Sequence, residues 1–261
     1  MTHKIRREWI ESCEFHPLTN VEVLRQVHAW IERDLEEKRQ PVLLLDLDST
    51  LYHVESRSHQ IVREWLADPE SQDHPVIRER VAALKPEHLG YSLLDTFGKL
   101  GLSVLDPLVE TALHSVQKFW GRRFFTNEYL KHDLAYPGAS EFVQKAHASG
   151  AEIVYLTGRD EPGMGEGTRA RLRADGFPFD LPRTRLLMKK SFELDDLEHK
   201  SAAADTIREL GNLVASFENE APNLIALSDL FPAAMHVFVD TVMSPNPALP
   251  KSGLYRITGF Q

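Results

Sequence analysis

The chain has 261 residues and a formal net charge of −9, with 30 Lys and Arg against 39 Asp and Glu. An acidic chain is a poor candidate for a nucleic-acid-binding protein, because neutralising a phosphate backbone requires clustered Lys and Arg. Hydrophobic residues at 42% and charged residues at 26% are typical of soluble globular proteins, and the length predicts one large domain or a core with a smaller insert.

Cysteine content and apolar runs bear on the cellular compartment. Cys13 is the single cysteine, so no intrachain disulfide can form and a reducing compartment is favoured. The first residues carry charges rather than an apolar run, and no stretch approaches the roughly 18 uninterrupted apolar residues of a membrane span. We therefore expect neither a signal peptide nor a membrane span, and a cytoplasmic protein.

The first 40 residues have the pattern of a helical extension. Thr19 and Glu22 have capping-box spacing, and apolar residues recur at helical intervals from Leu24 to Leu35. Pro41 ends this extension. Residues 42–45 then form a continuous apolar run, which is typical of a strand buried on both faces.

Residues 53–135 form a block with mostly helical spacing of apolar side chains. The block should consist of several short helices, because it is interrupted by four prolines: Pro69, Pro75, Pro86 and Pro107. Trp65 and Trp120 are expected to fill its core. We interpret 53–135 as an inserted helical domain, and residues 1–52 and 136–261 as the main core.

Strands and helices alternate from residue 136 onward. The pattern predicts strands at 153–156, 186–188, 213–217, 237–239 and 254–257. It predicts helices at 140–147, 168–174, 200–210 and 223–230. This alternation indicates an α/β fold with a Rossmann-like parallel sheet and helices on both faces. The glycine-rich segment 163–167 is interpreted as a surface turn rather than a phosphate-binding loop.

Polar residues follow several of the apolar runs. Asp46 and Asp48 follow the first run, Thr157 the second and Glu218 a later one. Ligands of open α/β sheets bind beyond the carboxyl ends of the strands, so these residues should gather at one edge. Lys200 is expected at the start of a helix that could face this edge.

Carboxylates gathered at one edge would repel one another without a cation. Oxygen ligands without Cys or paired His favour a hard ion such as Mg²⁺, which commonly works with phosphate substrates. An Asp can attack phosphorus to form an aspartyl-phosphate, and a second Asp can move protons. The sequence thus predicts phosphoryl transfer, with Asp46 as the nucleophile and Asp48 as the general acid and base.

These motifs resemble those of the haloacid dehalogenase superfamily. The pattern Asp46-x-Asp48-x-Thr50 is similar to the first motif of that family, Thr157 to the second and Lys200 to the third. Residues 218–220 stand in the position of the fourth motif. The helical insert resembles the type 1 caps of the superfamily.

The resemblance implies a role for each matching residue. Asp46 would be the nucleophile and a Mg²⁺ ligand, and Asp48 the acid and base and a ligand through its carbonyl. The residues implied in phosphate binding are Thr157, Gly158, Arg159 and Lys200. The fourth motif usually carries Asp, and the Glu found here reaches one methylene further. Glu218 is favoured as the remaining metal ligand, with Glu220 as the alternative.

The sequence leaves two questions open: which lysine reaches the site, and what Arg159 contacts. Lys189 and Lys190 follow a predicted strand directly and compete with Lys200, which is favoured by family spacing. Arg159 either contacts the substrate or pairs with Asp160.

We expect a Mg²⁺-dependent phosphatase that acts on a small phosphorylated metabolite. An acid at Asp48 favours phosphate esters, because dehalogenases of the superfamily generally lack one there. Two alternatives remain: a phosphotransferase or phosphomutase with the same nucleophile, and a catalytically weak member that binds a metal or a partner. The Glu in the fourth motif supports the weak member. The sequence does not indicate which ester is the substrate, or the oligomeric state.

Overall fold

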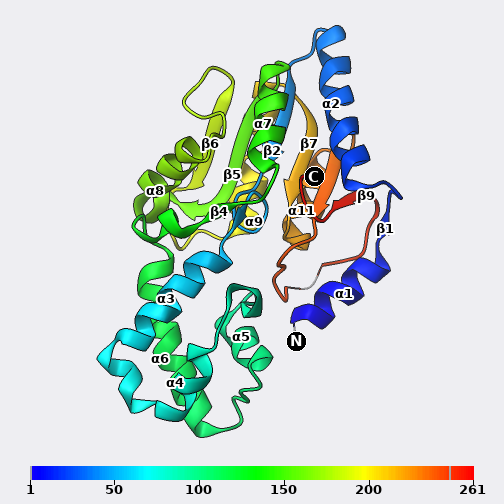
Figure 1. Cartoon of the computed structure of the whole chain (residues 1–261). Coiled ribbons are helices and arrows are strands. Elements are labelled where there is room, and N and C mark those ends of the chain that lie inside the picture. Colours follow the sequence, from blue (N-terminus) through cyan, green and yellow to red (C-terminus); the bar gives the residue numbers. More distant parts are fainter. Residues whose placement is uncertain (1, 247) are drawn as a thin grey trace.

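The computed structural model describes residues 2–246 and 248–261, and its centre is a parallel β-sheet (Figure 1). Seven strands lie in the order β1-β9-β8-β7-β2-β5-β6, and all the described neighbouring pairs are parallel. The strands are β1 (Glu14–Phe15), β2 (Pro41–Leu45), β5 (Glu152–Asp160), β6 (Thr184–Lys189), β7 (Asn212–Glu218), β8 (Met235–Val239) and β9 (Ser252–Ile257). The predicted Rossmann-like sheet is confirmed.

Strand β2 lies in the middle of the sheet because its side chains are apolar on both faces. All of its residues are buried, and it pairs with β7 on one side and β5 on the other. Leu43 and Leu45 belong to the largest hydrophobic core, while Val42 and Leu44 belong to a second core on the other face. The residues that follow β2 therefore lie at the centre of the carboxyl edge.

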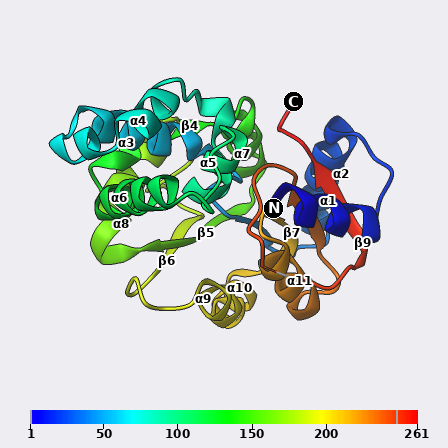
Figure 2. The same cartoon turned by 90° about the horizontal axis from the view of Figure 1, so that it is seen from below.

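Helices cover both faces of the sheet. Apolar residues of α2 (Asn20–Glu36), α7 (Ala139–Ala148) and α8 (Glu161–Ala174) join the largest core, and α2 begins with the predicted capping box. The other face is covered by α9 (Asp196–Ala202), α10 (Ala204–Leu210) and α11 (Ala221–Leu230). Figure 2 shows α9, α10 and α11 on the opposite side of the sheet from α2 and α7. Helix α1 (Thr2–Ser12) packs on β8 through Trp9 and Phe238.

The chain between β2 and β5 forms a helical insert next to the carboxyl edge, and this insert has a hydrophobic core of its own (Figure 1). Its elements are α3 (Glu55–Ala67), η1 (Pro69–Asp73), α4 (Pro75–Ala82), η2 (Pro86–His88), α5 (Leu93–Lys99), α6 (Pro107–Phe124) and η3 (Tyr129–His132). Trp65 is fully buried in this core, whereas Trp120 is only partly buried against it. A short antiparallel ribbon joins the two connections to the sheet, and it consists of β3 (Tyr52–His53) and β4 (Leu134–Ala135).

Three local predictions are wrong. Residues 14–15, expected to be helical, form the edge strand β1, because they pair with β9. The glycine-rich segment 163–167 is not a turn but part of α8. A Cβ at Gly167 would lie 2.5 Å from the Asn127 carbonyl oxygen, so this glycine permits close packing of α8 on the insert. The predicted helix 200–210 is two helices, and Lys200 lies in the last turn of α9 rather than at a helix start.

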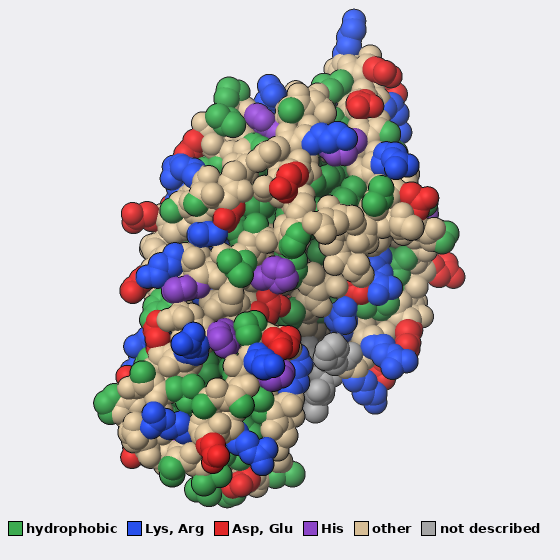
Figure 3. Space-filling view, in the orientation of Figure 1, with side chains coloured by type: hydrophobic (Ala, Val, Ile, Leu, Met, Phe, Trp, Pro, Cys, Tyr) green, Lys and Arg blue, Asp and Glu red, His purple; other side chains and the backbone are tan. Residues whose placement is uncertain are grey.

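Helix hydropathy and surface charge bear on whether the chain could span a membrane or bind a strongly charged partner. None of the helices in the described part of the chain is both long and apolar enough to cross a membrane. On the face seen in Figure 3, Lys and Arg side chains are interspersed with Asp and Glu rather than gathered by sign.

Candidate active site

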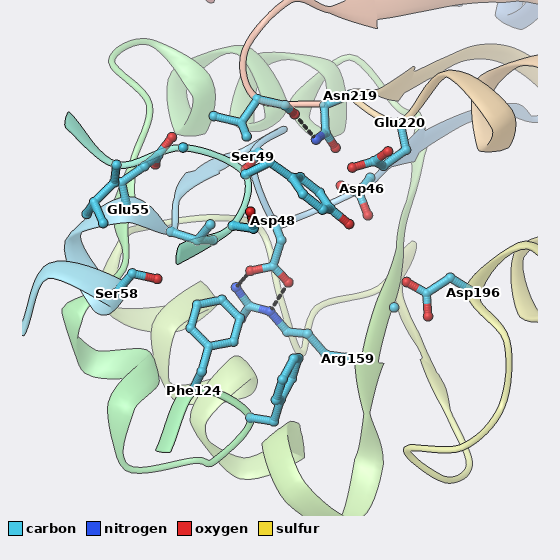
Figure 4. Close-up of a pocket in the computed structure, with 18 of the residues that line it drawn as sticks. Asp46, Asp48, Ser49, Glu55, Ser58, Phe124, Arg159, Asp196, Asn219 and Glu220 are labelled. Atoms are coloured by element: carbon cyan, nitrogen blue, oxygen red, sulfur yellow. Dashed lines mark hydrogen bonds and ion pairs between the residues drawn. The ribbon is translucent and has the colours of Figure 1, made fainter. Parts of the chain in front are cut away.

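The carboxyl edge of the sheet brings most of the predicted site residues together. Asp46 follows β2 and continues its pairing, because its N–H donates to the Phe217 carbonyl at 3.1 Å. Glu218 is the last residue of the neighbouring strand β7, and Arg159 lies near the end of β5 on the other side. Figure 4 shows Asp46, Asp48 and Arg159 around one hollow.

Lys200 joins two buried carboxylates. Its Nζ lies 2.7 Å from Asp46 Oδ1 and 2.6 Å from Glu218 Oε2, and all three side chains are at most 7% exposed. Burial raises the pKa of Asp46 against the lowering effect of Lys200. Burial and then the charge of Asp46 raise the pKa of Glu218 to about 8. Two carboxyl groups thus share one ammonium group.

A tight turn sets the position of Asp48 relative to Asp46. The Leu47 carbonyl accepts hydrogen bonds from the N–H groups of residues 50–52. Ser49 has a left-handed backbone, with φ of 59°. That region costs a non-glycine residue about 1–2 kcal/mol, so the surrounding contacts must hold the turn in place.

Two arginines bind Asp48. Arg159 donates Nε to Asp48 Oδ2 and Nη2 to Oδ1, both at 2.8 Å, and Arg57 Nη2 donates to Oδ1 at 2.8 Å. Asp133 accepts hydrogen bonds from both guanidinium groups, at 2.7 Å from Arg57 and 2.8 Å from Arg159. Although burial opposes ionisation, the two arginines hold the pKa of Asp48 well below its usual range.

Sequence reasoning missed Arg57 and Asp133. Arg57 comes from α3 in the insert and Asp133 from the return connection, 76 residues later, and both are fully buried. Nothing in the local pattern connects two positions so far apart. One signal was present: Arg57 precedes Ile61 by four residues and therefore lies on the apolar face of α3, where an arginine needs a buried partner.

Of the predicted phosphate-binding residues Thr157 and Gly158, Gly158 lines the pocket in the described structure and Thr157 does not. Thr157 is fully buried and its Oγ1 accepts the N–H of Arg159 at 3.2 Å. Gly158 lines the pocket, and a Cβ there would lie 2.3 Å from a carboxylate oxygen of Asp196. Arg159 does not pair with Asp160, whose carboxylate caps the start of α8.

The alternative lysines have other partners. Lys189 Nζ donates to Asp196 Oδ1 at 2.8 Å and to the Phe192 carbonyl at 3.1 Å, and Lys190 is exposed. Lys200 is the one of the three that contacts Asp46 in the described structure.

Glu218 and Glu220 face different partners. Glu218 Oε2 meets Lys200, and its Oε1 accepts the N–H of Glu220 at 3.0 Å. Both carboxylate oxygens of Glu220 accept the N–H of Ser244 at 3.1 Å. Burial raises the pKa of Glu220, against its hydrogen bonds to Ser244. Of the two glutamates, Glu218 is the one that shares a hydrogen-bonded partner, Lys200, with Asp46.

The donors at this edge fit a hard divalent cation. Five carboxyl groups face three cationic side chains here, so the acids outnumber the cations. The acids are Asp46, Asp48, Asp133, Glu218 and Glu220, and the cations are Lys200, Arg57 and Arg159. Among the described residues, no three or more His, Cys, Asp or Glu side chains are grouped so that they could hold a metal ion by themselves. Mg²⁺ needs no such cage, because it is usually held by one or two carboxylates together with waters and phosphate.

A pocket of about 400 Å³ lies between the carboxyl edge and the insert. The sheet side contributes Asp46, Asp48, Arg159 and Lys200, and the insert contributes mainly apolar and aromatic side chains. Figure 4 shows Glu55, Ser58 and Phe124 of the insert across from Asp46 and Glu220. The volume suits a small ligand held between the two bodies.

A sequence-family model described as haloacid dehalogenase-like hydrolase matches residues 41–181, which is more than half of the chain. The chain belongs to the haloacid dehalogenase-like hydrolase family. The match runs from β2 through the whole insert and β5, and so includes the first two candidate motifs of this hydrolase. The family resemblance of the motifs is confirmed.

A comparison with solved structures finds this fold in one hydrolase and a weaker likeness to another. A phosphatase candidate from Clostridium difficile has a TM-score of 0.51 and 14% identity, over 84% of this chain and 94% of that one. A haloacid dehalogenase-like family hydrolase from Streptococcus pneumoniae has a TM-score of 0.45 and 10% identity, over 82% and 94%. At 14% identity the likeness to the first of these structures shows the fold alone. Comparison with curated proteins gives no significant match.

Proposed function

We propose that this hydrolase is a Mg²⁺-dependent phosphatase that cleaves a small phosphate monoester through an aspartyl-phosphate on Asp46. The observation that carries the proposal is the buried group of Asp46, Lys200 and Glu218 at the carboxyl edge. It supplies a carboxylate nucleophile, a cation beside it and a second acid for a metal. The hydrolase family alone does not distinguish phosphate esters from other substrates.

In the first step, a carboxylate oxygen of Asp46 attacks phosphorus while the bond between phosphorus and the ester oxygen breaks. Lys200 Nζ, 2.7 Å from Asp46, offsets negative charge on the nucleophile and on the phosphoryl group. In the second step, water attacks the same phosphorus and frees Asp46. When bound, Mg²⁺ would be held by Asp46 and Glu218 and would neutralise phosphoryl charge.

Asp48 is the proposed carrier of protons in both steps. Arg159 and Arg57 keep it ionised in the substrate-free protein, which suits a base that activates water. Donation of a proton to the departing alcohol requires that Asp48 first loses part of this pairing and takes up a proton from solvent; in the second step Asp48 takes a proton from the attacking water. Arg57 belongs to the insert, so movement of the insert would weaken one of the two pairs.

We interpret residues 53–135 as a cap over a core formed by residues 1–52 and 136–261. The pocket between the two bodies supports this division, because the reacting carboxylates line one side and the insert lines the other. A cap that closes over a small ester would exclude water until the aspartyl-phosphate has formed.

A specific observation also favours a second candidate, a catalytically weak member that binds ligand without rapid turnover. A carboxylate bound by two guanidinium groups is a poor proton donor. In such a protein Asp48 would hold the insert in place through Arg57 rather than serve the reaction.

Phosphate release from a panel of small monoesters separates the two candidates. Release is measured in the presence of Mg²⁺ and in the presence of a chelator, for the natural chain and for Asp46→Asn. Asp205→Asn is the matched control, because the Asp205 side chain is 91% exposed. Mg²⁺-dependent release that is lost in Asp46→Asn and kept in Asp205→Asn supports the phosphatase. No release by folded natural protein, with Mg²⁺ bound, supports the weak member.

A further inference from the structure

The two sides of the pocket have different chemistry. The sheet side is charged, whereas the insert side is mainly apolar and includes Leu89, Tyr91, Leu93, Trp120, Phe124 and Phe125. The phosphate must lie on the sheet side, next to Asp46. The alcohol part of the ester therefore faces the insert.

The aromatic wall is fixed before any ligand arrives. Trp120 stacks on Phe124 with ring centroids 4.2 Å apart, and Phe125 lies edge-on to both rings at 5.5 and 5.0 Å. The indole N–H of Trp120 donates to Ser58 Oγ at 3.0 Å, so its polar group is already satisfied. An apolar surface held in this way favours a flat apolar group over a hydroxylated one.

Tyr91 extends this wall toward the sheet side. Tyr91 lines the same pocket as Glu220 and Asp196, and burial and then the charges of these two residues raise the pKa of its hydroxyl to about 12. Tyr91 is nevertheless 47% exposed, so it lies at the mouth of the pocket rather than in the core of the insert. A ligand passing this mouth meets a neutral aromatic ring.

The pocket has no spare positive charge for a second anionic group. Among the described residues that line it, the cationic side chains are Arg159 and Lys200, and both are paired with carboxylates. The charged residue on the insert side is Glu55, whose buried Oε2 has no hydrogen-bond partner and lies 3.8 Å from His53 Nδ1. A carboxylate or second phosphate on the ester would be repelled by Glu55 and left uncompensated.

We propose that the alcohol part of the substrate is an uncharged, ring-bearing apolar group, and that Glu55 excludes esters with a second anionic group. This inference rests on the proposed function, since it assumes that phosphate binds at Asp46. Aryl and arylalkyl phosphates fit this description, whereas phosphorylated acids and bisphosphates do not.

Binding of stable phosphonates tests the inference without requiring turnover. We would titrate the Mg²⁺-loaded protein with benzylphosphonate, methylphosphonate and phosphonoacetate by calorimetry. Benzylphosphonate should bind about 10- to 100-fold more tightly than methylphosphonate, from burial of the ring. Phosphonoacetate should bind more weakly than methylphosphonate.

Three variants assign the preference to residues. Tyr91→Ala and Trp120→Ala should each weaken benzylphosphonate binding and leave methylphosphonate binding unchanged. Leu105→Ala is the matched control, because Leu105 is a 91% exposed residue of the insert that does not line the pocket. Glu55→Lys should tighten phosphonoacetate binding about fivefold.

The outcomes separate this inference from the proposed function. Equal binding of benzylphosphonate and phosphonoacetate, or tighter binding of phosphonoacetate, would overturn the inference and leave the phosphatase intact. Failure of all three phosphonates to bind folded, Mg²⁺-loaded protein would overturn the phosphate site, and the inference with it.

Discussion

Arg57 gives the sharpest test of the ion pairs beneath the pocket, because its side chain is fully buried. It donates two 2.7 Å hydrogen bonds to Asp133, one of 2.8 Å to Asp48 and one of 3.1 Å to the Phe124 carbonyl. Arg57→Met keeps much of the aliphatic volume but removes all of these donors. Asp133 would keep one guanidinium partner, Arg159 at 2.8 Å, in a site that water does not reach.

Removal of one partner from a buried ion pair typically costs about 3–5 kcal/mol. We therefore expect Arg57→Met to lower the free energy of unfolding by about 3 kcal/mol or more. Urea denaturation of the metal-free protein, followed by tryptophan fluorescence, measures this loss. Arg63→Met is the matched control, because Arg63 is exposed on the same helix; its effect should stay within about 0.5 kcal/mol.

A double variant checks the cause of the loss. Combining Arg57→Met with Asp133→Asn removes both the arginine and the charge that it leaves uncompensated. The combined loss should be smaller than the sum of the two single losses by about 1 kcal/mol or more. Additive losses, or an Arg57→Met loss no larger than that of Arg63→Met, would refute the reasoning.

Three further predictions concern Lys200 and the acids beside it. Lys200→Met should lower turnover about 100- to 1000-fold through loss of charge stabilisation, while the exposed Lys190→Met should not change it; steady-state kinetics measure both. Glu218→Gln should weaken Mg²⁺ binding about 10-fold or more by calorimetry, and Glu220→Gln should weaken it less; the reverse order would assign the metal to Glu220. The pKa of Glu218 rises from 4.5 to about 8 on folding without metal, so the folded state binds this proton more tightly than the unfolded state. The free energy of unfolding should therefore fall as pH rises across that interval, and Glu218→Gln should reduce the slope of the unfolding free energy against pH.

The sheet and its carboxyl edge could be predicted because their signals are local. A strand buried on both faces is a continuous apolar run, and residues 42–45 and 153–156 are such runs. Parallel strands end at one edge, so the polar residues after each run had to come together there. Lys200 was favoured over Lys189 and Lys190 by family spacing rather than by topology, and it contacts Asp46 even though its place within the helix was predicted wrongly.

The ion pairs and the pocket wall could not be predicted, since they depend on how the insert folds back. Arg57 meets Asp133 across 76 residues, and no local spacing encodes that contact. Trp120 has the helical spacing of a core residue, but the fold turns it partly toward the pocket. Glycine-rich residues 163–167 favour a turn by propensity, and close packing of α8 on the insert overrides it.

The most direct test of the central claim is to look for phosphate on Asp46 during turnover. Protein mixed with Mg²⁺ and an aryl phosphate would be quenched in acid, digested and analysed by mass spectrometry. We predict a phosphoryl group on the peptide that contains Asp46, and its absence in Asp46→Asn. Continued phosphate release with no phosphoryl group on Asp46, or with the group on another residue, would contradict the account.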